Sequence, residues 1–330
     1  MKISIITVTL NNKAGLMRAI ESVSSQTYKN VEHIIVDGGS TDGSIEAIKN
    51  LQFTIYNLVF ISEADSGIYD AINKGIKLAT GDVIGLLHSD DFYKDEFVLE
   101  KYADVFEQSG KQPAHSSLSS TENEREIKDF SVNFLLRNDN ALPTTHYLQP
   151  TIEAVYSDLV YVRKKLKVSH RDDKPKSQKS KNEDIDHSKL KIEHSIIRYW
   201  KAHKIKKDYL TTSFSLLTTH HLLNGWMPPH PTLFIRKSIF DKYGLYRTDM
   251  KIAADYEMIL RLFYKNKITT NYLPHTTYCM TMGGASNKSI KNIIQKSKED
   301  YFAMKIHGFP IPVKTLIYKN CSKVTQFFKR

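Results

Sequence analysis

Residues 83–91 read Val-Ile-Gly-Leu-Leu-His-Ser-Asp-Asp, and this stretch decides how the rest of the chain is interpreted. The apolar run predicts a buried strand, and two adjacent acids, Asp90 and Asp91, follow at its end. Two carboxylates placed there are costly without a counter-charge. A divalent cation that also binds phosphate oxygens would supply that charge. From these residues alone, a solvated turn in which Asp91 caps a helix is the alternative.

The residues before this stretch alternate between strand and helix patterns. Three more strands are predicted, at residues 3–9, 31–36 and 57–61. The segments between them have the apolar spacing of helices, and such alternation predicts an α/β fold with a mostly parallel sheet. Ligands of such sheets bind beyond the carboxyl ends of the strands. We therefore expect the site where Asp37 and the Asp90–Asp91 pair follow their strands.

Two polar segments follow the second and third strands. Residues 37–43, Asp-Gly-Gly-Ser-Thr-Asp-Gly, are a dense turn signal, in which Asp37 either accepts a hydrogen bond from a nucleotide or serves turn chemistry. Residues 65–75 predict a helix that Asp65 or Ser66 would cap. Gly75 inside this helix costs about 1 kcal/mol relative to alanine. Its presence indicates a close approach of the backbone to another element.

The composition is that of a soluble globular chain, with 41% hydrophobic and 25% charged residues over 330 positions. This length is typical of about two domains. Two cysteines exclude a disulfide framework and a four-cysteine zinc site. No apolar stretch reaches the roughly 18 residues of a transmembrane helix, and the N-terminal apolar run is too short for a secretory signal. The expected location is the cytoplasm.

The positive charge is concentrated in two places. Residues 163–207 contain 16 Lys/Arg and 6 Asp/Glu, so their net charge of 16 − 6 = +10 nearly equals the total of +11. The segment from Lys314 to Arg330 adds five basic residues and no acid, interleaved with apolar ones. This tail is either a basic amphipathic segment on an anionic membrane surface or a solvated or packed helix. Nucleic acid is not an expected partner, because the basic stretch lacks regular aromatic residues.

The order of several motifs is more specific than any one of them. They are residues 7–9, 36–43, 65–71, 79–82 leading to 89–91, 227–232, 253–257 with 260–262, and 283–286. In this order they resemble the family 2 glycosyltransferases, which are inverting enzymes of the GT-A fold. The resemblance covers about residues 1–108 and 225–307. It implies a Rossmann-like, mostly parallel central sheet flanked by helices, with inserted loops and a helical C-terminal region.

The resemblance also implies which residues bind the donor. Contacts with the nucleotide are expected from Thr9, Asp37, Asp65 and Asp90, with Asp37 facing the base and Asp90 near the ribose. Asp91 is the expected ligand of a divalent metal, Mn²⁺ or Mg²⁺, on the diphosphate. The sequence differs from many relatives in having a serine, not another acid, at position 89.

On the acceptor side, Asp255 occupies the place of the family's catalytic base. From the residues alone, Asp255 would be a helix N-cap. His230, between prolines, is either a loop residue held by a hydrogen bond or a wall of the acceptor site. Glu257 is expected on the acceptor side, where it either steadies the helix of Asp255 or is solvated.

The function implied by the resemblance is sugar transfer with inversion, from a nucleotide-sugar to a hydroxyl. A UDP-sugar is the expected donor. The expected acceptor is a glycan or a lipid-linked oligosaccharide in the biosynthesis of a surface polysaccharide or O-antigen. The setting is the cytoplasm, with peripheral attachment to the inner face of the cell membrane. The alternative is a non-catalytic module of the same fold that binds a nucleotide or a glycan.

The expected organisation has four parts. Residues 1–108 form the donor-binding half and 109–150 an insertion. Residues 151–307 form the acceptor-binding and catalytic half, with a basic mobile loop at 164–195. Residues 308–330 form the basic amphipathic tail.

Overall fold

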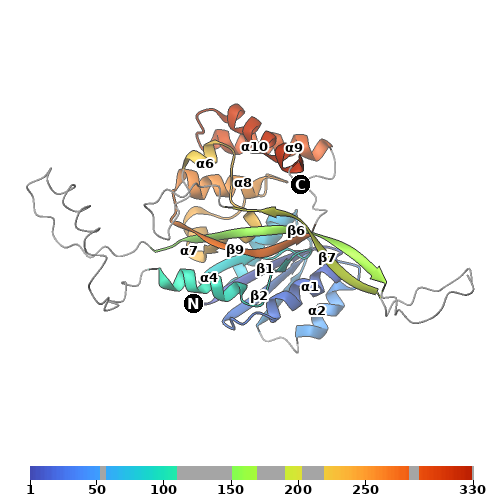
Figure 1. The fold of residues 1–330 in the computed structure, drawn as a ribbon. Coiled ribbons are helices and arrows are strands. Elements are labelled where there is room, and N and C mark those ends of the chain that lie inside the picture. The colour runs from blue at the N-terminus through green and yellow to red at the C-terminus, as the bar shows by residue number, and fades with distance from the viewer. Residues whose placement is uncertain (53–56, 110–150, 169–189, 203–218, 282–289, 329–330) are drawn as a thin grey trace, which may run out of the picture.

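The computed structural model describes residues 1–52, 57–109, 151–168, 190–202, 219–281 and 290–328 (Figure 1). Nearly all of the predicted insertion at 109–150, and the motif at 283–286, lie outside the described residues. Within the described ranges, no helix is both long and apolar enough to cross a membrane.

One curled sheet of nine strands forms the centre of the described structure. The strand order is β3-β2-β1-β4-β8-β6-β9-β5, and β7 pairs with β6. The strands are β1 (Ile3–Thr9), β2 (Val31–Asp37), β3 (Leu58–Ser62), β4 (Val83–Leu86), β5 (Phe92–Tyr93), β6 (Ala154–Val168), β7 (Leu190–Trp200), β8 (Phe234–Arg236) and β9 (Thr270–Thr281).

Helices cover both faces of this sheet (Figure 1). They are α1 (Lys13–Ser24), α2 (Ser44–Gln52), α3 (Ile68–Leu78), α4 (Val98–Gln108), α6 (Thr219–Leu223), α7 (Lys237–Tyr243), α8 (Ala254–Ile259), α9 (Ile290–Ile306) and α10 (Pro312–Phe328). Successive residues of β1 point to opposite faces, so Ile6 and Val8 join a core with α3, α8 and α9. Ile3 and Ile5 join a second core with α1 and α4.

The α/β prediction is confirmed, and the first four strands are parallel as expected. The remainder of the sheet is mixed. Strand β8 enters antiparallel between β4 and β6, whereas β6 and β9 are parallel to each other. The parallel half therefore presents its carboxyl ends at one edge, where ligands of such sheets bind.

The prediction of a mobile loop at 164–195 is wrong at both of its ends. Lys164–Val168 continue β6, and residues 190–195 belong to β7, in an antiparallel pair whose register runs from Val168↔Leu190 to Leu159↔Trp200. The backbone ladder of a hairpin does not need apolar side chains, so the polar composition did not reveal it. Residues 169–189 lie outside the described residues.

Gly75 confirms the expected close approach. A Cβ atom at this position would lie 2.5 Å from Cγ2 of Ile6, so α3 packs directly on β1 at the glycine. This contact fixes the height of α3 above the sheet. It thereby also fixes Tyr69, which lies in the first turn of α3, nearer the carboxyl edge of the strands.

Glu32 on β2 anchors the opposite edge of the sheet, far from the carboxyl ends of the strands. Its buried carboxylate accepts hydrogen bonds from the Thr80 N–H (2.6 Å), the Gly81 N–H (3.1 Å) and the Ser4 hydroxyl, and pairs with Lys2 at 2.7 Å. Burial opposes ionisation, but these donors together lower the pKa of Glu32 to about 2.

We expect Glu32→Gln to destabilise the protein by about 2 kcal/mol near neutral pH, because buried donors lose a charged acceptor. The pKa of Glu32 is lower in the folded state than in the unfolded chain. The stabilisation is therefore complete above about pH 4.5 and is lost as the pH falls toward 2. Urea unfolding measures the free energy of unfolding of wild type and variant. The difference between the two should be smaller at pH 3 than at pH 7. The exposed Glu21 on α1 provides the control, Glu21→Gln, which should have little effect at either pH.

Candidate functional site

The site lies at the carboxyl edge of the parallel strands, as predicted. Thr9 ends β1 and pairs in register with Asp37, which ends β2. β4 ends at Leu86, and the chain then turns through Ser89, Asp90 and Asp91. The structure thus brings the predicted donor residues of three strands to one edge of the sheet.

The Asp90–Asp91 turn is fixed by α1. Gly15 in the first turn of α1 packs against the Ser89 carbonyl oxygen, and a Cβ atom there would overlap it. The Asn12 amide, which caps α1, donates to Asp90 Oδ1 at 2.8 Å. Arg18 donates to the Asp90 carbonyl oxygen, also at 2.8 Å. The acidic turn is therefore a rigid feature and not a solvated connection.

The two adjacent acids point in different directions. Asp90 is exposed, whereas Asp91 is 3% exposed and accepts hydrogen bonds from the Thr281 N–H (2.9 Å) and the Tyr278 hydroxyl (3.2 Å). Burial raises the pKa of Asp91 to about 7, although both donors act in the opposite direction. A buried carboxylate with this pKa lacks a compensating positive charge.

A divalent cation fits this arrangement. Within the described ranges no group of three His, Cys, Asp or Glu side chains is arranged to hold a metal by itself. Mg²⁺ and Mn²⁺ at nucleotide sites commonly take one or two carboxylates and complete their coordination with phosphate oxygens and water. Asp91, with Asp90 beside it, supplies such a partial set. The uncompensated charge of Asp91 is the observation that favours a cation here.

Three other donor-side residues lie at the ends of β1, β2 and β3. The hydroxyl of Thr9 is buried and has no hydrogen-bond partner among the described residues, so it is available to a ligand. Asp65 is half-buried, and its carboxylate lies against Gly38, where a Cβ atom would be 2.7 Å from Asp65 Oδ2. Gly38 therefore lets the carboxylate of Asp65 approach the loop after β2.

Asp37 has a different orientation from the one expected. Its carboxylate is fully buried and accepts bonds from the N–H groups of Gly39 (3.0 Å) and Ser40 (2.9 Å) and from the hydroxyls of Ser40 and Ser62. In this structure Asp37 shapes the loop around it. A direct contact with the base would require one of these four bonds to be given up.

Asp255 lies in the first turn of α8, half-buried. The N-cap of this helix is Ala253, so the interpretation of Asp255 as the cap is wrong. The loop before it is held by Glu299 of α9, whose carboxylate accepts the N–H groups of Lys251, Ile252 and Ala253 at 2.8–3.0 Å. The Tyr69 hydroxyl lies 3.4 Å from Asp255 Oδ1. Asp255 is thus positioned by groups from α3 and α9.

Two histidines of the candidate site, His88 and His230, have lowered pKa values. Burial lowers the pKa of His88 to about 4, and the nearby His230 acts in the same direction. The Nδ1 atom of His88 is buried and has no partner among the described residues. His230 is held by a 2.8 Å hydrogen bond to the Tyr246 hydroxyl, and burial lowers its pKa as well. Both rings are therefore neutral at physiological pH.

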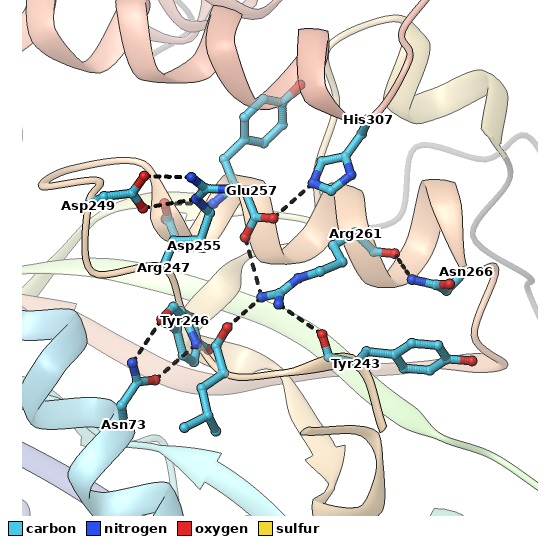
Figure 2. Close-up of polar contacts among 12 residues, drawn as sticks. Asn73, Tyr243, Tyr246, Arg247, Asp249, Asp255, Glu257, Arg261, Asn266 and His307 are labelled. Atoms are coloured by element: carbon cyan, nitrogen blue, oxygen red, sulfur yellow. Dashed lines mark hydrogen bonds and ion pairs between the residues drawn. The ribbon is translucent and has the colours of Figure 1, made fainter. Parts of the chain in front are cut away.

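Glu257 steadies the helix of Asp255, which is the first of the two alternatives that the sequence left open. It lies two residues after Asp255, and positions i and i+2 of a helix face different directions. Figure 2 shows its carboxylate between Arg261 and His307, at 3.3 Å and 2.9 Å, in the helical layer. Arg261 also donates to the carbonyl oxygens of Tyr243 and Leu245. Glu257 therefore joins α8 to the end of α9 and steadies the helix that carries Asp255.

We expect Glu257→Gln to lower the free energy of unfolding by about 2 kcal/mol, because the half-buried Arg261 loses its counter-charge on the buried Glu257. Asp249→Asn is the matched control. Asp249 also pairs with an arginine, Arg247, but its side chain is 59% exposed, so its loss should cost less than about 1 kcal/mol. Chemical denaturation of the two variants checks this; equal effects would show that Glu257 does not act as a buried partner.

Sequence reasoning missed several residues that position the site. Glu299 and Tyr278 gave no signal, because their partners are 46 to 187 residues away along the chain. Asn73 did give one, as a polar residue on the apolar face of a predicted helix. Its amide exchanges two hydrogen bonds with the backbone of Tyr246, at 2.8 and 2.9 Å (Figure 2). This clamp joins α3 to the loop that leads to Asp255.

Comparison with known proteins shows what the N-terminal part of the chain resembles. Residues 4–161, a little under half of the chain, match the model of the family described as Glycosyl transferase family 2. The matched range includes the candidate donor residues from Thr9 to Asp91.

Among relatives, an uncharacterized glycosyltransferase of Mycobacterium tuberculosis is 37% identical over 114 residues, 34% of this chain and 41% of the relative. A PGL/p-HBAD biosynthesis glycosyltransferase of Mycobacterium bovis is 36% identical over 101 residues, 30% of this chain and 40% of the relative. The matched part spans less than half the length of either relative.

Solved structures show the fold over nearly the whole chain. TarS of S. aureus (residues 1–349) superposes with a TM-score of 0.57 at 14% identity, over 99% of this chain and 74% of that one. The mannosyltransferase PcManGT of Pyrobaculum calidifontis superposes with a TM-score of 0.51 at 14% identity, over 96% of this chain and 68% of that one. The expected GT-A fold is confirmed.

Proposed function

We propose that the protein is an inverting glycosyltransferase that moves one sugar from a nucleotide-sugar to a hydroxyl group. The observation that carries the proposal is the pair at the end of β4: a buried, uncompensated Asp91 beside an exposed Asp90, at the edge where Thr9 offers an unpartnered hydroxyl. This arrangement is suited to a nucleoside diphosphate and a cation. Asp255, half-buried in the first turn of α8, is suited to act on the acceptor.

In this proposal the chain's own residues divide the chemistry. Asp91 would hold a divalent cation, Mn²⁺ or Mg²⁺, which when bound would neutralise charge on the leaving diphosphate. Thr9, Asp65 and Asp90 contact the nucleotide, and Asp37 keeps the loop after β2 in shape. Asp255 accepts the proton of the acceptor hydroxyl as that oxygen attacks the anomeric carbon. A single in-line displacement inverts the anomeric centre and needs no covalent enzyme intermediate.

The donor is proposed to be a UDP-sugar. TarS has been crystallised with UDP-GlcNAc, and PcManGT with GDP-Man and Mn²⁺, so neighbours of this fold hold both kinds of nucleotide. The acceptor is proposed to be a glycan or lipid-linked oligosaccharide in the synthesis of a surface polysaccharide or O-antigen, met at the inner face of the cell membrane. Residues 1–108 would bind the donor and residues 151–307 the acceptor.

A donor screen tests the proposal. Release of nucleoside diphosphate is followed with UDP-, GDP- and dTDP-sugars, with Mn²⁺ or Mg²⁺ and then with excess EDTA. Release from one donor that stops with EDTA is the expected result. If no donor turns over, nucleotide binding is measured by calorimetry under the same conditions. Metal-dependent binding without turnover would indicate a missing acceptor, and no binding to any nucleotide would contradict the proposal.

A non-catalytic binding module of the same fold is the second candidate. It is favoured by one observation, since the buried carboxylate of Asp37 is already occupied by its own loop. Such a module would bind nucleotide or glycan without turnover, and replacing Asp255 would change nothing. The enzyme would also keep its nucleotide binding without that carboxylate, but it would lose its turnover.

A further inference from the structure

The outer layer of α9 and α10 carries an unusual concentration of exposed apolar side chains. Seventeen large hydrophobic residues are exposed in the described structure, and nine of them lie between residues 293 and 318. They are Ile293, Ile294, Tyr301, Phe302, Ile306, Ile311, Val313, Ile317 and Tyr318. Figure 1 shows these two helices as the layer farthest from the sheet, beyond α8. We call the exposed side of α9 and α10 the outer face.

The direction in which α10 points is fixed by a buried ion pair. Lys319 is 2% exposed; its Nζ lies 2.8 Å from Asp300 Oδ1 of α9 and 3.0 Å from the ring centroid of Tyr256. The Thr315 hydroxyl donates to the Leu223 carbonyl oxygen at 2.8 Å. This part of the expected tail is therefore a packed helix. Val313 (55% exposed) and Ile317 (54%) consequently face solvent.

Helices α9 and α10 contribute no exposed carboxylate to the outer face among their described side chains. Between residues 290 and 330 the sequence contains only two acids, Glu299 and Asp300. Glu299 is buried against the loop before Asp255, and Asp300 is fully buried between Lys296 and Lys319. The charged side chains left at the surface of these helices are lysines, namely Lys291, Lys298, Lys305 and Lys314.

Exposed apolar side chains together with exposed lysines favour a partner that carries negative charge and can also bury apolar side chains. A second copy of the chain would bring lysines against lysines, with no exposed acid of α9 or α10 to pair with them. A bilayer that contains anionic lipid offers phosphate groups to the lysines and acyl chains to isoleucine and tyrosine. Lysine side chains can extend along an apolar surface and keep the ammonium group at the level of the headgroups. Tyrosine is also a typical residue of this interface.

We propose that the outer face of α9 and α10 binds the surface of an anionic lipid bilayer. This inference deepens the proposed function, because it names the surface through which the enzyme would meet a membrane-held acceptor. The proposed membrane-binding surface is therefore not the expected basic tail at residues 308–330 alone. It is formed by two helices, α9 and α10, that a buried ion pair holds together. Binding is reversible and weakens with salt, since it combines shallow burial of apolar side chains with attraction between exposed charges.

The test is co-sedimentation of the full chain with vesicles of phosphatidylcholine, alone or with about 30 mol% phosphatidylglycerol. Donor, acceptor and metal are absent, so the outcome does not depend on whether the chain transfers sugar. The wild type should bind the anionic vesicles and release on raising the salt. Lys314→Glu with Ile317→Glu should reduce the fraction bound at least about tenfold. The matched control is Lys77→Glu with Leu78→Glu, an exposed lysine and leucine at the end of α3, and it should bind like the wild type.

Two results would overturn the proposal. One is a wild type that does not sediment with anionic vesicles, or binds them no better than neutral ones. The other is equal loss of binding in the α10 variant and the α3 control, which would show that general charge and not the outer face binds lipid. Sedimentation velocity without lipid measures whether the chain forms a dimer. A dimer that Ile317→Glu abolishes, with no vesicle binding, would assign the face to a second copy instead. Thermal unfolding confirms that both double variants are folded.

Discussion

The Asp255→Asn variant is expected to lose about 10³-fold in turnover, while its KM for the donor stays close to that of the wild type. The amide is nearly isosteric with the carboxylate, so the hydrogen bond from the Tyr256 N–H (2.8 Å) and the neighbourhood of Tyr69 can persist. What the amide cannot do is accept a proton from the acceptor hydroxyl. The loss should therefore fall on kcat and leave donor binding intact.

Steady-state kinetics with the donor identified in the screen, together with calorimetric titration of the nucleotide, separates these two effects. Asp249→Asn is a control from the same loop region, an exposed acid paired with Arg247, and it should keep nearly full turnover. An Asp255→Asn enzyme with unchanged kcat would remove Asp255 from the role of base. A variant that also fails to bind nucleotide would indicate that the residue supports the fold of the donor site instead.

The parallel half of the fold could be predicted because its signals are local. Each strand from β1 to β4 is rich in apolar or β-branched residues, and β1, β2 and β3 are each followed by a helix whose apolar residues recur at helical spacing. β6 and β7 were only partly predicted, since a hairpin is stabilised by pairing between two segments and their lysine-rich ends contain no alternation. The antiparallel insertion of β8 between β4 and β6 was not predicted either, because three residues are too few for a pattern.

For the site, residue identity and position could be predicted but orientation could not. Asp37, Asp90 and Asp91 were placed correctly at the ends of their strands. Whether each carboxylate faces a ligand or its own loop depends on donors such as Ser62 and Thr281, which lie on other elements. Glu257 shows the same limit: its role in steadying the helix of Asp255 was one of two alternatives, and the sequence did not indicate that Arg261 and His307 are its partners.

The Asp91→Asn variant is expected to lose about 10²- to 10³-fold in metal-dependent turnover, yet to be more stable than the wild type when metal is absent at pH 8. Both effects follow from one observation, the burial that raises the pKa of Asp91 to about 7. In the proposed enzyme the carboxylate would hold the cation, and an amide is a weaker ligand for Mg²⁺ or Mn²⁺. In the metal-free protein the same carboxylate is a buried, uncompensated charge.

The sign of the pH dependence distinguishes this explanation from a simple loss of packing. The pKa of Asp91 is higher in the folded protein than the ordinary value of 3.8, so between about pH 4 and 7 the folded state holds a proton that the unfolded chain has released. The stability of the metal-free wild type therefore falls as the pH rises through this window. Asp91→Asn removes the contribution, so the variant should change less over the same range.

Thermal unfolding at pH 5 and pH 8, with EDTA or with Mn²⁺, measures both consequences together. The wild type should gain more stability from Mn²⁺ at pH 8, where the carboxylate binds metal without first losing a proton. The variant should gain little at either pH. Asp104→Asn, an exposed acid on α4, is the control and should follow the wild type. If Asp91→Asn responded to Mn²⁺ as the wild type does, the cation would be held elsewhere, and the raised pKa would be a feature of the fold alone.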